Sequence, residues 1–102
     1  MENLVNIVRE EVEKYAGNGE GGNLRLYLLH NETSDTFAVA AVDYPNRKYP
    51  ASVVVMARVV GEIVIIEDDK TDKPLYKALI QRGIQREHII LAYDGELYPE
   101  LT

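Results

Sequence analysis

The chain contains no cysteine, so it can form neither a disulfide framework nor a metal site built on thiolates. It has only two histidines, His30 and His88, and their spacing is not that of a zinc-ligand pair, so we expect both at the surface. No apolar run approaches the roughly 20 residues of a membrane-spanning helix, and residues 1–15 carry acids where a signal peptide would be apolar. We therefore expect a soluble cytoplasmic protein with no metal or other cofactor.

Basic residues are also in the minority. The sequence has 17 Asp and Glu against 11 Lys and Arg, which gives a net charge of −6. Because affinity for nucleic acids comes largely from Lys and Arg contacts to phosphates, we expect the isolated protein to bind duplex DNA weakly or not at all. The densest basic spot in the first half is Arg47-Lys48, with Arg25 and Arg58 as candidate neighbours.

The remaining composition is that of a globular protein. With 102 residues, of which 46% are hydrophobic, the chain can form one domain that spans residues 1–102. Apolar residues recur at helical spacing in two segments, which predicts helices over 3–15 and 73–83. Alternating or continuous β-type runs predict strands at 23–30, 36–43, 51–60, 62–67 and 88–93. The glycine-rich segment 17–22 follows a helix and precedes a strand, the reverse of a dinucleotide-binding turn, so we interpret it as a linker.

These segments predict an α+β fold with the order α-β-β-β-β-α-β. The last strand, helix and strand imply a right-handed crossover to a parallel neighbour. We therefore expect a mixed sheet of about five strands with the helices packed on it. The strands at 51–60 and 62–67 are the most continuously apolar, and we expect them at the centre of the sheet.

The acidic stretch EDDKTDKP, residues 67–74, allows two interpretations. In the first, Asp43, Asp68 and Lys70 form the Mg²⁺ site of a restriction-type nuclease, in which carboxylates hold the metal and the lysine assists attack by water. In the second, Thr71 or Asp72 caps the following helix, and Pro74 lies in its first turn. The second interpretation accounts for every residue of the stretch, so we favour a structural role.

The loop YPNRKYP, residues 44–50, is the best candidate for a binding site. It places Arg47 and Lys48 between Tyr44 and Tyr49, and aromatic residues beside arginine are common at protein interfaces. The prolines restrict the loop and reduce the entropy that is lost on binding. The alternative is a simple connection whose tyrosines cover the sheet edge. We take Tyr44, Arg47, Lys48, Tyr49, Asp68 and Asp69 as candidate partner-binding residues.

Residues 54–96, VVMARVVGEIVIIEDDKTDKPLYKALIQRGIQREHIILAYDGE, carry a family resemblance. This stretch resembles the XisI family, the controlling factors of fdxN-element excision. The shared features are a strand hairpin, an acidic turn, a helix ending in Gly83-Ile84, a charged link at 85–88 and an apolar strand at 89–93. In the first half of the chain the elements agree with the family in their order.

The resemblance implies an accessory or regulatory protein of a DNA-excision system that is not itself an enzyme. It implies a partner protein of the XisH type, with an endonuclease-like fold, and no catalytic residues. An acidic companion can cover the basic groove of such a partner. Two other functions remain open from the residues alone, the metal-dependent nuclease and a small-molecule-binding domain. We also expect a homodimer that forms through the loop 44–50 and the tail residues Tyr98, Pro99 and Leu101.

Overall fold

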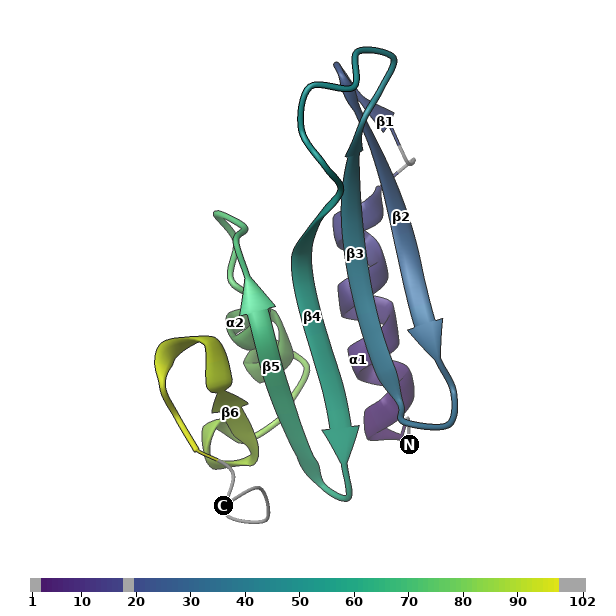
Figure 1. Cartoon of the computed structure of the whole chain (residues 1–102). Helices are drawn as coiled ribbons and strands as arrows, with labels where there is room; N and C mark the ends of the chain where they lie inside the picture. Colours follow the sequence, from purple (N-terminus) through teal and green to yellow (C-terminus); the bar gives the residue numbers. More distant parts are fainter. Residues whose placement is uncertain (1–2, 18–19, 98–102) are drawn as a thin grey trace.

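The computed structural model describes residues 3–17 and 20–97, and Figure 1 shows their arrangement. One six-stranded sheet has the order β1-β2-β3-β4-β5-β6, antiparallel throughout except for the parallel pair β5 and β6. Its strands are β1 (Glu20–Gly21), β2 (Leu24–Asn31), β3 (Thr36–Asp43), β4 (Ser52–Val60), β5 (Ile63–Asp69) and β6 (Ile89–Leu91). Helices α1 (Leu4–Glu13) and α2 (Leu75–Gln81) lie on one face of this sheet (Figure 1). The α+β class, the element order and the mixed sheet are confirmed, and the two-residue β1 is the addition.

Helix α1 forms where the sequence predicts it. The Asn3 side chain accepts a hydrogen bond from the Asn6 N–H at 2.8 Å and so caps the first turn. Val8 and Val12, one helical turn apart, are fully buried against the sheet. A 3₁₀ turn (η1, Lys14–Ala16) continues the helix to Gly17, which ends it at a positive φ of 54°.

The core fills the space between the helices and the sheet. Because alternate strand residues point to opposite faces, β3 contributes Phe37 and Val39, and β5 contributes Val64 and Ile66. From the other side, Leu75 and Leu79 of α2 are fully buried against them. The sequence predicted β4 and β5 at the centre of the sheet. This is correct for β4, whereas β5 lies next to the edge strand β6.

No helix in the described ranges 3–17 and 20–97 is long and apolar enough to cross a bilayer.

The start of α2 corrects one prediction. Neither Thr71 nor Asp72 caps this helix, because its N-cap is Pro74, which makes no side-chain capping bond. Asp69, at the end of β5, provides the bond instead. Its Oδ2 accepts from the Leu75 N–H at 2.7 Å, and its Oδ1 accepts from the Thr71 N–H at 3.0 Å and the Thr71 hydroxyl at 2.6 Å. Asp69 therefore stabilises both the loop between β5 and α2 and the first turn of α2.

We expect Asp69→Ala to lower the free energy of unfolding by about 1–2 kcal/mol, the usual cost of a lost capping carboxylate. The matched control is Asp72→Ala, three positions along the same turn, where the carboxylate is exposed. Urea unfolding measures both changes. Equal losses for the two variants would contradict the role given to Asp69.

Candidate functional site

The loop between β3 and β4 projects beyond the end of the sheet (Figure 1). Asn23 anchors one side of it, because its C=O accepts from the Tyr44 N–H at 3.0 Å and its side-chain amide bonds the Asn46 backbone at 3.1 and 3.3 Å. Asp43 anchors the other side, where its Oδ2 accepts from the Tyr49 N–H at 2.8 Å. The loop is therefore held in one conformation by polar side chains at its base.

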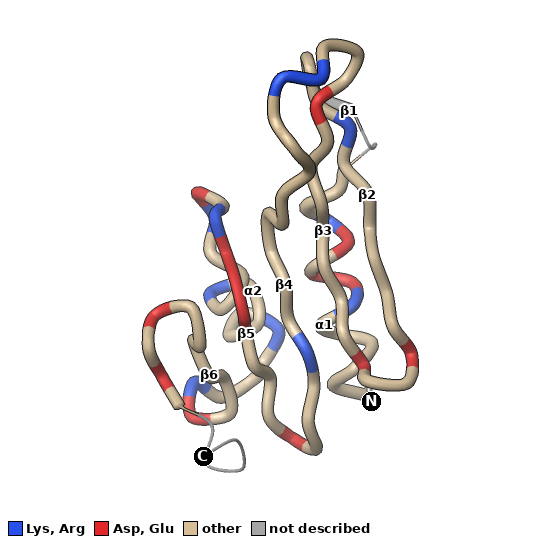
Figure 2. The backbone as a smooth tube through the Cα atoms, viewed as in Figure 1, with Lys and Arg blue, Asp and Glu red and all other residues tan. Residues whose placement is uncertain are grey.

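Three cations and two aromatic rings meet at this loop, with Arg25 contributed by the neighbouring strand β2. The Arg25 guanidinium lies 4.6 Å from the centroid of the Tyr44 ring, and the Arg47 guanidinium lies 5.6 Å from the same ring. The Lys48 ammonium lies 5.5 Å from the Tyr49 ring. Both tyrosines are exposed. We name Arg25, Tyr44, Arg47, Lys48 and Tyr49 the tip cluster. Figure 2 shows basic residues in blue at this end of the molecule, opposite the N-terminus.

The structure confirms one of the two expected basic neighbours of this loop. Arg25 joins the tip cluster because its strand runs beside β3, where Leu24 is paired with Asp43. Arg58 does not join. It lies near the opposite end of β4, where its Nε makes an ion pair of 2.7 Å with Oε2 of Glu67. The prediction placed Arg58 too close because sequence distance does not show where along a strand a residue lies.

Asp68 and Asp69 lie apart from the tip cluster, at the end of β5. Asp68 is opposite Met56 and makes an ion pair with Lys70 at 3.6 Å. Asp69 accepts hydrogen bonds from the segment that leads into α2. The candidate partner-binding residues therefore form two separate groups. The tip cluster combines aromatic and basic side chains, and all of them are exposed except the half-buried Arg25.

The carboxylates required for the nuclease interpretation are also far apart. Asp43 is the last residue of β3, Asp68 is the second-last residue of β5, and β4 lies between these strands. The register places Ser52 beside Ala41 and Met56 beside Asp68, so Asp43 and Asp68 lie on the order of 20 Å apart at standard strand dimensions. Within residues 3–17 and 20–97 no three His, Asp or Glu side chains are grouped to hold a metal ion.

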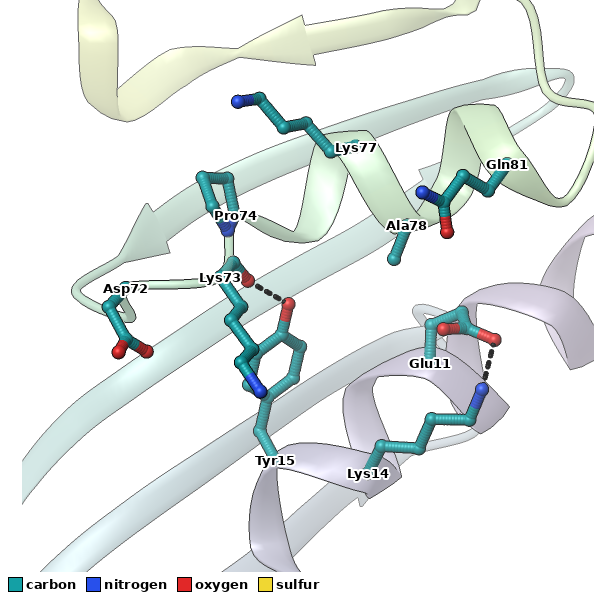
Figure 3. Close-up of a pocket in the computed structure, with 9 residues that line it drawn as sticks. All are labelled: Glu11, Lys14, Tyr15, Asp72, Lys73, Pro74, Lys77, Ala78 and Gln81. Carbon is teal, nitrogen blue, oxygen red and sulfur yellow. Dashed lines mark hydrogen bonds and ion pairs between the residues drawn. The ribbon is translucent and has the colours of Figure 1, made fainter.

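A groove between α1 and α2, which the sequence did not predict, has a volume of about 600 Å³. Figure 3 shows the side chains that line it: Glu11, Lys14, Tyr15, Asp72, Lys73, Pro74, Lys77, Ala78 and Gln81. The Tyr15 hydroxyl donates to the Lys73 C=O across the groove. Burial and the nearby Asp69 carboxylate raise the Tyr15 pKa, so the phenol stays protonated as a donor. We interpret the contacts along this groove as those that hold the two helices together, and we name this region the helix junction.

Glu11 is the buried acid at this junction. Its Oε2 accepts from Lys14 Nζ at 2.9 Å and from Arg82 Nη1 at 2.7 Å, and Arg82 Nη2 donates to Glu10 at 2.9 Å. Burial acts to raise the pKa of Glu11, but the bonds from Lys14 and Arg82 outweigh it and lower the pKa below its usual value of 4.5. Glu11 is therefore an ionised structural group whose carboxylate binds two cations.

Comparison with known proteins decides the family. The family model described as XisI protein matches residues 1–102, the whole chain. The chain belongs to the XisI family. The resemblance seen in residues 54–96 is thus confirmed, and it extends to the N-terminal helix and the first strands.

Two solved structures from Anabaena variabilis share the XisI fold with this chain. One is a XisI-like protein, with a TM-score of 0.75 and 16% identity over 85% of this chain and 81% of that one. The other is the fdxN element excision controlling factor XisI, with a TM-score of 0.71 and 18% identity over 95% and 92% of the two chains. At these identities the likeness concerns the fold. No curated protein matches this chain.

Proposed function

We propose that this XisI-family protein is a regulatory subunit of a DNA-excision system and acts by binding a partner protein of the XisH type, without catalysing a reaction itself. The match of the XisI family model to the whole chain carries this proposal. One of the proteins with a similar structure is an excision controlling factor, which supports a role in the same process. The scattered positions of Asp43 and Asp68 give no support to the competing nuclease function.

The tip cluster is the surface that we assign to the partner. Its tyrosines and arginines are the residue types that contribute most to binding energy at protein interfaces. The loop is already held by Asn23 and Asp43, so little conformational entropy is lost when it binds. Its three cations fit an acidic patch on the partner. The acidic remainder of the chain favours the basic surface that a DNA-acting partner needs, and it orients the encounter.

The experiment is an excision assay in cells that lack this protein, scored by amplification of the junction that excision creates. Complementation with the wild-type chain should restore the junction. The double variant Arg47→Glu and Lys48→Glu should reduce its yield at least tenfold, because each reversal places like charges against the partner. The matched control is Lys73→Glu with Lys77→Glu, the same charge change on exposed lysines of the helix junction. Full activity of the tip-cluster variant would contradict the assignment.

A second expectation separates partner binding from DNA binding. Three cations in the tip cluster give at most about three phosphate contacts, and each contributes slightly less than one unit to the salt slope. We therefore expect no mobility shift of duplex DNA by the isolated protein at about 150 mM salt, a concentration at which weak phosphate contacts are screened. A shift that disappears in the Arg47→Glu, Lys48→Glu variant would make the tip cluster a DNA contact instead.

A further inference from the structure

The outer edge of β2 is open over most of its length. Strand β1 pairs only with Leu24 and Arg25, and no other described residue forms a ladder on that side of β2. The Tyr44 N–H donates to the Asn23 C=O, so odd-numbered residues of this strand direct their backbone groups toward β3. Even-numbered residues direct theirs outward. Leu28 and His30 therefore each present an N–H and a C=O at an edge that β1 leaves uncovered.

This edge lacks the devices that normally protect edge strands. Native proteins blunt such edges with lysine, proline, inward-pointing charges or a covering element. The segment LYLLHN, residues 26–31, has no Lys, Arg, Asp, Glu or Pro, in a chain where 27% of residues are charged. Tyr27 and Leu29 are 52% and 51% exposed on the sheet face opposite the helices. The edge therefore fits an added strand with apolar side chains.

We propose that this edge is an interface between two copies of the chain. The two β2 strands pair antiparallel across a two-fold axis at Leu29, and the two sheets merge into one. An antiparallel strand can always pair with itself under two-fold symmetry, so the surface is self-complementary. With the axis at Leu29, Leu28 faces His30 of the second copy. That register uses the outward N–H and C=O of both residues and leaves the pairing of β1 with Leu24 and Arg25 intact.

The side chains favour a second copy as the occupant, and no charge along 26–31 opposes it. On the open face the axis brings Leu29 against its own equivalent, and it brings Tyr27 against Asn31, which buries the exposed apolar groups of this edge. Two copies with a net charge of −6 each repel one another over most of their surfaces, but no charged side chain faces the axis along 26–31. The tip clusters then lie at opposite ends of the merged sheet, free for other partners. This places the dimer contact away from the loop 44–50. The tail residues Tyr98, Pro99 and Leu101 lie outside the described residues.

Cross-linking through a single introduced thiol tests the register. Since the chain has no cysteine, Leu29→Cys creates a single thiol per chain. The axis places the two Cα atoms at position 29 of the dimer directly opposite one another, about 4.5 Å apart. This spacing allows a disulfide. Mild oxidation should convert most of this variant into a covalent dimer on a non-reducing gel. The matched control, Leu97→Cys, stands at a site that is 74% exposed and should stay largely uncross-linked. Equal cross-linking of the two variants would overturn the proposal.

Light scattering at about 100 μM, well above a micromolar dissociation constant, tests the backbone ladder. The wild-type chain should show twice its 11.5 kDa mass. Leu28→Pro removes an outward N–H and leaves the β3 ladder in place, so it should give the single-chain mass with an unchanged circular dichroism spectrum. If that variant does not fold, Leu29→Lys, which sets like charges face to face across the axis, replaces it. A wild-type monomer, or a dimer that survives in the folded variant, would overturn the proposal. Neither outcome bears on the excision assay.

Discussion

Replacing Phe37 with alanine is expected to lower the free energy of unfolding by about 3–5 kcal/mol, the range for loss of a fully buried phenylalanine. Phe37 is the only phenylalanine of the chain and has no exposed surface. It lies on the core face of β3, and its ring stacks on His30 with centroids 4.5 Å apart. A domain of this size has a total stability of about 5–15 kcal/mol, so the loss removes a large share of it.

Urea unfolding followed by circular dichroism measures this loss. The matched control is Tyr49→Ala, which removes an aromatic side chain of similar size from the exposed loop and should change stability by less than about 0.5 kcal/mol. If Phe37→Ala and Tyr49→Ala had similar effects, Phe37 would not be at the centre of the core.

Arg82→Met is expected to lower the free energy of unfolding by about 2–3 kcal/mol. The Glu11 side chain is only 6% exposed, and removal of Arg82 leaves its carboxylate with Lys14 alone. Breaking a fully buried pair costs about 3–5 kcal/mol. We expect less here because Arg82 is 26% exposed and partly screened by water. Arg9→Met is the matched control, since Arg9 makes its ion pairs at the surface and should cost less than about 1 kcal/mol.

The same junction gives stability a dependence on pH. The pKa of Glu11 is lower in the folded chain than its usual value of 4.5, so its contribution to stability is present in full above that pH. The contribution is lost as the pH falls through the folded pKa. The stability advantage of the wild type over Glu11→Gln should therefore shrink below pH 4.5. Unfolding curves between pH 7 and pH 3, a span of about four units around the reference acid pKa, measure this difference, and a constant difference would contradict the role given to Glu11.

Hydrophobic periodicity was sufficient to predict most of the fold. The apolar face of residues 3–15 predicted α1, and the alternating or continuous β-type runs predicted β2 to β6 within a few residues at each end. The cap of α2 was not predictable in this way. A capping residue normally adjoins the helix, whereas Asp69 reaches Leu75 across a turn whose path depends on where β5 ends.

Most of the tip cluster could be predicted from the sequence because four of its residues lie in one short segment. Tyr44, Arg47, Lys48 and Tyr49 belong to one loop, and Arg25 joins them through the register of β2 and β3. The helix junction could not be predicted, since Glu11 and Arg82 are 71 residues apart and meet only when both helices lie on one face of the sheet. The open edge of β2 likewise follows from the shortness of β1, which no local pattern indicates.

Binding of this chain to the purified XisH-type partner is the decisive measurement for the proposed function. Isothermal titration calorimetry at about 150 mM salt, where long-range charge attraction is screened, should give saturable binding with a micromolar or tighter dissociation constant. The Arg47→Glu, Lys48→Glu variant should bind at least tenfold more weakly, a loss of about 1.4 kcal/mol. The Lys73→Glu, Lys77→Glu control should bind as the wild type does. No heat of binding at concentrations of about 100 μM, far above a micromolar dissociation constant, would contradict a function exerted through that partner.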